Sequence, residues 1–151
     1  LAIEFLKKGL ISHFNDAQIL NNIAYYLALE NRTEEAIYYV EKAKNQGINK
    51  STVTEACLIA TYGLICFREN KLEVGRAEYL KAIEKTTVDR STDLNKIAIL
   101  NYAREEILAK TNKIEDVMNL VSQISLTENS DISLKKLKKE VEELYQRYKH
   151  L

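Results

Sequence analysis

The sequence lacks the residues that most often interrupt helices. It contains no proline, no tryptophan and only four glycines among 151 residues. Proline and glycine break or weaken helices, whereas the plentiful alanine, leucine, isoleucine, glutamate and lysine favour helices or pack readily on their faces. The hydrophobic content of 46% argues against global disorder and suits one folded domain. We therefore expect an all-α fold.

An excess of either charge is also missing. Lysine and arginine number 22, as do aspartate and glutamate, so the formal net charge is zero. Proteins that bind nucleic acid or membrane surfaces usually carry a basic excess, because phosphate neutralisation drives that binding. No apolar run reaches the roughly 20 residues of a membrane span, and no signal-peptide pattern is present. We expect a soluble cytoplasmic protein without a nucleic-acid or membrane partner.

The sequence offers little catalytic or metal chemistry. The glycines are scattered, so no phosphate-binding loop can be drawn, and no GxSxG or HExxH pattern occurs. The histidines, His13 and His150, lie near the chain ends with no cysteine cluster beside them. Cys57 and Cys66 point in opposite directions on one expected helix, which indicates reduced, buried thiols. We expect a protein that is not an enzyme and holds neither metal nor cofactor.

Adjacent glutamates at 34–35, 105–106 and 142–143 are the nearest approach to a carboxylate pair. Consecutive residues on a helix point about 100° apart, so the two carboxylates of a pair do not face each other. Acid–base catalysis by such a pair is therefore not supported. We expect all three pairs to lie on solvated helix faces.

Capping residues mark the expected helix boundaries. Asn15 and Asp16 precede one helix, Thr33 precedes another, and Thr52 with Glu55 three residues later forms a capping box. Short polar breaks separate the later helices, so neighbouring helices should pack antiparallel. The expected helices span about 16–30, 33–46, 52–69, 71–86, 91–111, 113–126 and 131–149.

Small residues recur at corresponding places in successive helix hairpins. The interval from Ala24 to Gly63 is nearly the same as the interval from Gly63 to Ala103. Small residues at a crossing let two helix backbones approach closely, so these positions should be the contact points of each hairpin. The corresponding positions are Ala24, Ala36 and Ala43; Gly63, Gly75 and Ala82; and Ala103, with the larger residues Val117 and Ile124 in the second helix of the third copy.

A partial copy of the pattern stands at the start of the sequence. Ala2 precedes Ala36 by the same interval by which Gly9 precedes Ala43. That interval resembles the helix–turn–helix period of about 34 residues in the tetratricopeptide repeat (TPR). The resemblance implies a TPR-like α-solenoid, a right-handed superhelical stack of antiparallel helix hairpins. It implies one domain, 1–151, from a longer protein: the second helix of a truncated repeat (1–14), repeats at 16–48 and 52–87, a degenerate repeat at 91–126 and a capping helix at 131–151.

The last segment carries one apolar stripe with residues at spacings of three and four. The stripe comprises Leu134, Leu137, Val141, Leu144, Tyr148 and Leu151. A helix that caps the stack is the simpler interpretation, because terminal repeats need a polar outer face; a short coiled coil is the alternative. Lysines at 135–136 and 138–139 could touch phosphates or an acidic partner, but their alternation with glutamate favours a solubilising face.

The TPR resemblance also implies a binding groove lined by the first helix of each repeat. Carried over, it places Tyr25, Leu64 and Arg104 in the groove, each directly after a small residue. Asn21 lies one turn before Tyr25, and Phe67 and Arg68 lie about one turn after Leu64. Such amide, aromatic and guanidinium groups could hold a peptide. The lysine and asparagine pattern of the family's carboxylate-clamp subset is not reproduced here.

Several functions fit these observations. The first is a non-catalytic scaffold or adaptor that binds a peptide or partner protein in its groove. The second is a regulatory domain similar to the peptide-sensing domains of bacterial regulators. An enzyme has the weakest support, and a purely structural stack is a further alternative. Because Ile3, Leu6 and Leu10 should lack a preceding helix, we also expect weak dimerisation through residues 1–10.

Overall fold

The computed structural model describes residues 1–12, 16–46, 51–88 and 92–151. In these ranges the regular structure consists of helices alone, which confirms the all-α prediction. The boundaries predicted at 14, 48 and 91, and His13, lie outside the described residues. The helices are α1 (Ala2–Ser12), α2 (Ala17–Leu29), α3 (Thr33–Lys44), α4 (Thr52–Arg68), α5 (Leu72–Val88), α6 (Thr92–Leu108), α7 (Ile114–Ser122) and α8 (Ile132–Lys149).

Side-chain hydrogen bonds cap the starts of α2, α4 and α8, whereas α3 and α7 begin without one. The carboxylate of Asp16 accepts from the second and third backbone amides of α2, as its predicted capping role requires. The predicted capping box at Thr52 is wrong, because Ser51 is the capping residue. Ser51 has extended backbone angles, and its Oγ accepts from the Thr54 amide at 3.1 Å. Asp131 caps α8 in the same manner as Asp16.

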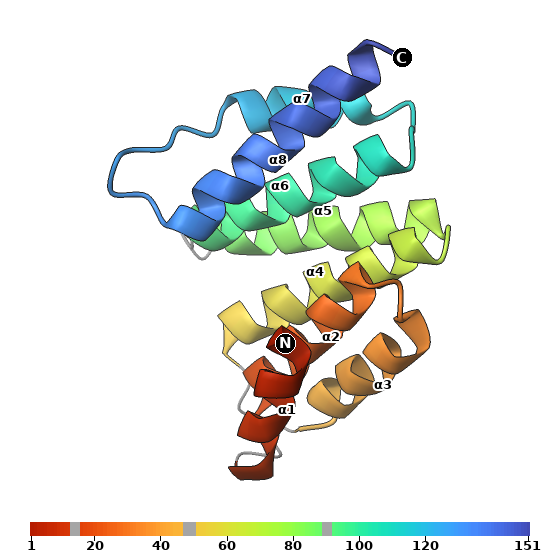
Figure 1. Ribbon diagram of the computed structural model, residues 1–151, viewed down its shortest axis with the longest axis vertical. Coiled ribbons are helices and arrows are strands. Elements are labelled where there is room, and N and C mark those ends of the chain that lie inside the picture. The colour runs from red at the N-terminus through yellow and green to blue at the C-terminus, as the bar shows by residue number, and fades with distance from the viewer. Residues whose placement is uncertain (13–15, 47–50, 89–91) are drawn as a thin grey trace.

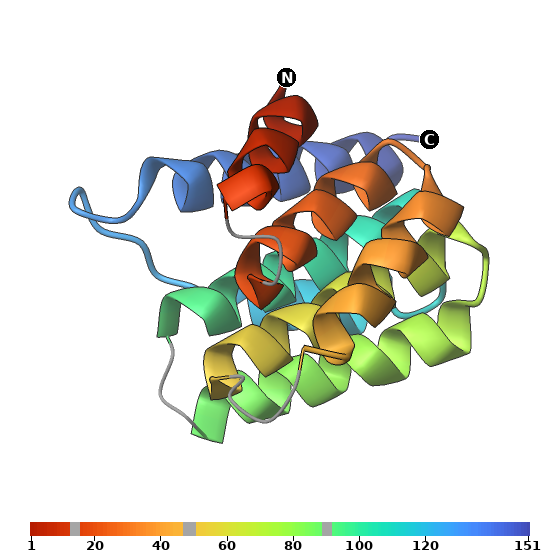
Figure 2. The same cartoon turned by 90° about the horizontal axis from the view of Figure 1, so that it is seen from below.

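The helices pack mainly on their neighbours in sequence (Figure 1). The antiparallel pairs α2–α3 and α4–α5 make the most extensive contacts, and α4 also packs against α2, α3 and α6. Helix α8 packs on α6, and α1 packs on α2. Seen from below, α1 and α8 lie on the same side of the molecule (Figure 2). Two helices distant in sequence therefore flank the same face.

The crossing of α4 and α5 depends on two glycines. A Cβ on Gly75 would stand 2.7 Å from Cδ2 of Phe67 and 2.9 Å from the carbonyl oxygen of Gly63. A Cβ on Gly63 would stand 3.1 Å from the carbonyl oxygen of Gly75. Ala24, Ala36 and the other small residues of the three hairpins are buried as well. The prediction that the small residues are hairpin contact points is confirmed for the crossing of α4 and α5 and stays a prediction for the other two hairpins.

The turns after α2, α4 and α6 share one conformation. Asn31, Asn70 and Lys110 have φ values of 61°, 61° and 53°, in the left-handed region. After each helix, two backbone amides fold back onto carbonyls of the last turn, the arrangement of a Schellman cap. The intervals between these turns equal the intervals between the small residues that precede them in the three helices. The left-handed turn therefore recurs along the chain at the same intervals as the small residues.

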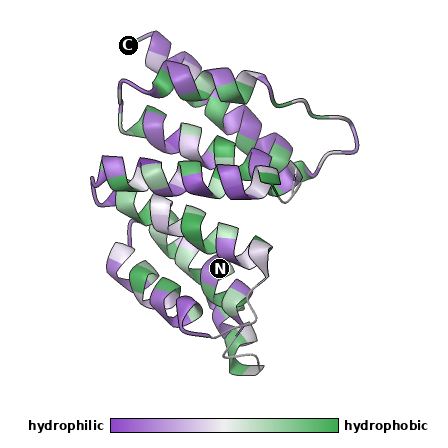
Figure 3. Ribbon diagram, turned by 180° about the vertical axis from the view of Figure 1, so that it is seen from behind, coloured by the Kyte–Doolittle hydropathy of each residue, from purple (hydrophilic) through white to green (hydrophobic). Residues whose placement is uncertain are grey.

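The apolar residues form an extended core between the helices, and hydrophilic residues cover much of the outer helix faces (Figure 3). The expected exposed face of Ile3, Leu6 and Leu10 is wrong: Ile3 is buried, and Leu6 and Leu10 pack against the core. The exposed apolar residues of this segment are instead Leu1, Phe5 and Ile11, and weak dimerisation stays a prediction.

Both cysteines are free thiols, as predicted. Cys66 is buried, and Cys57 is half-buried. No helix in the described ranges is long and apolar enough to span a bilayer.

Candidate functional site

A groove of about 890 Å³ lies on the side of the molecule where α1 and α8 stand. Residues of α2, α4, α5 and α6 line it, and residues of α1 and α8 form further parts of its wall. Its lining mixes apolar side chains, such as Phe5, Tyr26 and Leu137, with amides, such as Asn22 and Asn101. The groove is therefore the feature that could hold an elongated ligand with both apolar and polar groups.

Three of the residues predicted to bind a partner line this groove. Asn21 and Tyr25 lie on α2, and Arg104 lies on α6. Asn21 and Arg104 are each only 5% exposed, whereas Tyr25 is half-buried. The hydroxyl of Tyr25 donates to Oδ1 of Asn101 at 3.0 Å, and Nδ2 of Asn101 donates to the Ile97 carbonyl. The structure thus brings one predicted cluster together from α2 and α6.

The predicted placement of Leu64, Phe67 and Arg68 in the groove is wrong. Leu64 is fully buried in the core, and Phe67 packs against the rings of Tyr79 and Tyr102. Helix α4 has neighbours on most sides, so residues late in this helix face other helices. The groove instead meets α4 along Ala56, Cys57, Ala60 and Thr61.

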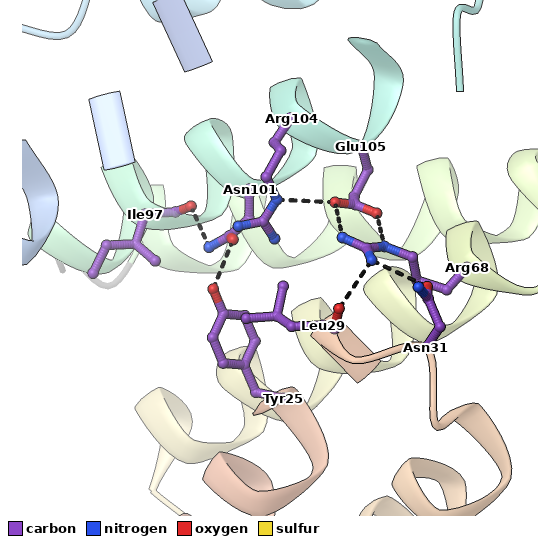
Figure 4. A network of polar contacts seen from close by, with 8 residues as sticks. All are labelled: Tyr25, Leu29, Asn31, Arg68, Ile97, Asn101, Arg104 and Glu105. Atoms are coloured by element: carbon purple, nitrogen blue, oxygen red, sulfur yellow. Dashed lines mark hydrogen bonds and ion pairs between the residues drawn. The ribbon is translucent and has the colours of Figure 1, made fainter. Parts of the chain in front are cut away.

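Arg68 belongs to a polar network at the ends of α2, α4 and α6 (Figure 4). Its Nε and Nη2 donate to the two carboxylate oxygens of Glu105 at 2.5 and 3.1 Å. Its Nη1 donates to the Leu29 carbonyl and to Oδ1 of Asn31. Leu29 and Glu105 meet at Arg68, and four residues before each of them Tyr25 bonds to Asn101, so α2 and α6 run in the same direction.

The carboxylate of Glu105 accepts hydrogen bonds from two guanidinium groups. Besides the fork from Arg68, its Oε2 accepts from Nε of Arg104 at 3.0 Å. Glu105 and Arg104 are both deeply buried, and Arg68 is largely covered. Two positive charges therefore share one negative charge beside the groove, which leaves one positive charge in surplus.

Glu106, the next residue, makes a separate network. Its carboxylate accepts from Nε and Nη2 of Arg76 at 2.6 and 3.1 Å, and from the hydroxyl of Thr111. The hydrogen bond with Glu106 is the main cause of a raised Arg76 pKa. Arg76 also contacts exposed Glu73. The prediction of a solvated pair at 105–106 is wrong, because α4, α5, α7 and α8 all pack on α6 and leave little of it in solvent.

Two buried polar atoms on the groove wall lack a hydrogen-bond partner within the described residues: Oδ1 of Asn21 and Nη2 of Arg104. The first can only accept a hydrogen bond, and the second can only donate one. Leaving buried polar groups unpaired is costly, and most buried polar groups in folded proteins have partners. Both residues line the groove, but the two atoms themselves have almost no accessible surface, so neighbouring side chains must move before a ligand can reach them.

The remaining groups offer little reactivity. Burial raises the pKa of the Cys57 thiol, so this groove residue stays protonated at neutral pH and is a poor nucleophile. Within the described residues, no three histidine, cysteine, aspartate or glutamate side chains gather in a way that could hold a metal ion. What the groove displays is hydrogen-bonding and apolar surface.

Sequence reasoning missed Asn101 and misassigned Glu105. Asn101 lies one helical turn before Arg104, so the groove face of α6 could have indicated it once Arg104 was placed there. No sequence pattern pointed to the role of Glu105. One of its partners, Arg68, lies far away in the sequence, and the other, Arg104, is the adjacent residue.

The chain matches no protein-family model, no curated protein and no solved structure. Its function is therefore argued from its own residues.

Proposed function

We propose that this chain is a non-catalytic interaction module, a scaffold or adaptor, that binds a segment of another polypeptide in its groove. In this proposal the hairpins form a right-handed TPR-like stack, and α2, α4 and α6 supply the inner surface. The recurrence of the same left-handed turn and the same small-residue crossing supports a repeat architecture.

The groove is the single observation that carries the proposal. Its volume of about 890 Å³ is within the range of ligand sites, and its lining combines apolar anchors with unpaired polar atoms. Apolar side chains give a peptide affinity, whereas amide and guanidinium groups fix its direction and register. A polypeptide segment supplies both kinds of group along its length.

Filling the groove tests the proposal. Ala60 is half-buried on the groove wall, so Ala60→Trp should occupy space that a ligand needs. Ala77 is exposed on α5 outside the groove lining, and Ala77→Trp is the matched control. Each variant is used as bait in a native lysate after circular dichroism shows a native helix content and cooperative melting.

We expect proteins captured by the parent chain to be retained by Ala77→Trp and lost by Ala60→Trp. Equal capture by both variants contradicts the proposal and moves the interaction to another surface.

A regulatory peptide-sensing domain is the second candidate. The observation in its favour is that α1 and α8, from opposite ends of the chain, both contribute to the groove wall. A ligand that touches both helices would couple their positions. Hydrogen exchange would then show protection of α1 and α8 together when a peptide binds, whereas protection confined to α2, α4 and α6 favours a simple adaptor.

A further inference from the structure

The polar atoms of the groove define the chemistry of the segment it binds. We infer that this segment carries an aspartate or glutamate side chain whose carboxylate accepts a hydrogen bond from the guanidinium of Arg104. The inference rests on the proposed function, since it concerns the ligand of the same groove.

The first argument is charge. Arg104 is permanently charged and 5% exposed, and its acidic partner, Glu105, already accepts hydrogen bonds from Nε and Nη2 of Arg68. A buried charge without full compensation is costly, so the site favours a ligand that brings one negative charge. A carboxylate supplies one, whereas a doubly charged phosphate group would exceed the surplus.

The second argument is hydrogen bonding. Nη2 of Arg104 is buried without an acceptor, and Nε of the same guanidinium is already bonded to Glu105. The bond from Nε fixes the orientation of the guanidinium, and Nη2 lies buried beside the groove without an acceptor from the described residues. Hydrogen bonds between a guanidinium and a carboxylate are among the strongest in proteins.

The third argument is the complementary acceptor on α2. Asn21 lies four residues before Tyr25, Arg104 lies three residues after Asn101, and Tyr25 bonds to Asn101. Because α2 and α6 run in the same direction, the backbones of Asn21 and Arg104 are about 10 Å apart along the helix axes. Because no described Cα atoms of α2 and α6 lie within 8 Å of each other, the direct distance is longer, and an extended peptide needs about four residues or more to cover it. Asn21, whose Oδ1 is buried without a donor from the described residues, lies on the wall that such a segment would follow.

The carboxylate belongs to a side chain rather than to a chain terminus. Helix α8 packs on α6 and presents Leu134 and Leu137 on one side of the groove, while α1 presents Phe5 and Leu6 on another. Arg104 stands on α6 and lines the same groove. A segment that reaches Arg104 and also covers both apolar parts runs through the groove, so its carboxylate is assigned to a side chain within the segment.

Peptide display tests the inference. The probes are two random peptide libraries, one with both ends of the random segment fused to other polypeptide and one with a free carboxyl terminus. Both are selected on the parent chain, Arg104→Gln, Arg147→Gln and Ala60→Trp. Arg147 is exposed on α8 outside this groove lining, so its variant controls for the loss of one arginine.

We expect peptides with an internal aspartate or glutamate flanked by apolar residues from the library without free termini. Changing that residue to asparagine or glutamine should weaken binding to the parent chain about tenfold or more, and Arg104→Gln should weaken it equally. Combining the peptide substitution with Arg104→Gln should weaken binding no more than either change alone, and Arg147→Gln should leave binding unchanged.

Different failures have different meanings. Peptides that require an open groove but show no acidic preference overturn the inference and leave the proposed function standing. An acidic preference confined to free carboxyl termini overturns the choice of a side-chain carboxylate. If no selected peptide loses binding in Ala60→Trp, both the proposed function and the inference are overturned.

Discussion

Glu105 and Glu106 are neighbours in sequence, yet they lie in networks of opposite character. Glu106 pairs with one guanidinium, that of Arg76, and also accepts from Thr111. Glu105 is shared by Arg68 and Arg104, and Nη2 of Arg104 is left without an acceptor at the groove. The first network is balanced and joins helices, whereas the second is incomplete and faces a cavity.

Under the proposed function, the difference separates polar groups that stabilise the fold from polar groups that would bind a ligand. A buried ion pair contributes little over an apolar replacement, but removing one partner is costly because the other charge stays buried. An incomplete network already bears part of that cost in the unbound state. Substitutions in the two networks should therefore change stability to different extents.

The largest loss of stability is expected for Glu105→Gln. The change leaves the guanidiniums of Arg68 and Arg104 without their common carboxylate, and should lower the free energy of unfolding by about 4 kcal/mol. Urea denaturation measures the loss, with exposed Glu34→Gln as the control. A loss no greater than that of the control would show that Glu105 is not the common counter-ion.

Glu106→Gln should cost less, about 3 kcal/mol, because Arg76 keeps its contact with Glu73. The comparison is made in the same urea experiment. A larger loss of unfolding free energy for Glu106→Gln than for Glu105→Gln would contradict the view that the Glu105 network carries a surplus positive charge and the Glu106 network does not.

Gly75→Ala tests the helix contact that sets the position of Arg76. Its Cβ would overlap Phe67, so α5 must shift away from α4, at a cost of about 2 kcal/mol. Gly9→Ala is a matched control, since a Cβ there stands 3.8 Å from Ile19 and alanine favours the helix. Thermal melting should show a lower Tm for the first and an equal or higher Tm for the second.

Arg104→Gln should change the free energy of unfolding by about 1 kcal/mol or less. It removes the surplus buried charge but leaves Glu105 paired with Arg68. Arg76→Gln, which unbalances the other network, is the comparison and should be clearly less stable. Equal losses in the two variants would contradict the distinction between the networks.

The smallest effect is expected at Lys110, which has a φ of 53° in the turn between α6 and α7. Lys110→Gly relieves the left-handed backbone without touching either network, and should raise the free energy of unfolding by about 0.5 kcal/mol. Differential scanning calorimetry can resolve the shift. A decrease in the free energy of unfolding would indicate that the side chain of Lys110 stabilises the fold by more than its left-handed backbone destabilises it.

The fold was more predictable than the site because its signals are local. Caps such as Asp16 and small residues such as Gly75 act through contacts that recur at fixed spacings. Leu64 was misplaced because the resemblance gives a position along a helix but not how many neighbours surround it. The roles of Glu105 and Glu106 depend on arginines in α4 and α5, far away in the sequence, and no pattern within α6 reveals those partners.

Arg68 also determines how the groove can deform. It ties the carboxyl ends of α2, α4 and α6 by charged and backbone hydrogen bonds, whereas nearer their amino ends the Tyr25–Asn101 bond is neutral. Charged hydrogen bonds are roughly twice as strong as neutral ones, so an outward force separates the amino ends first. The three helices would therefore open about a hinge at Arg68, and their amino ends, which lie farthest from that residue, would move the most.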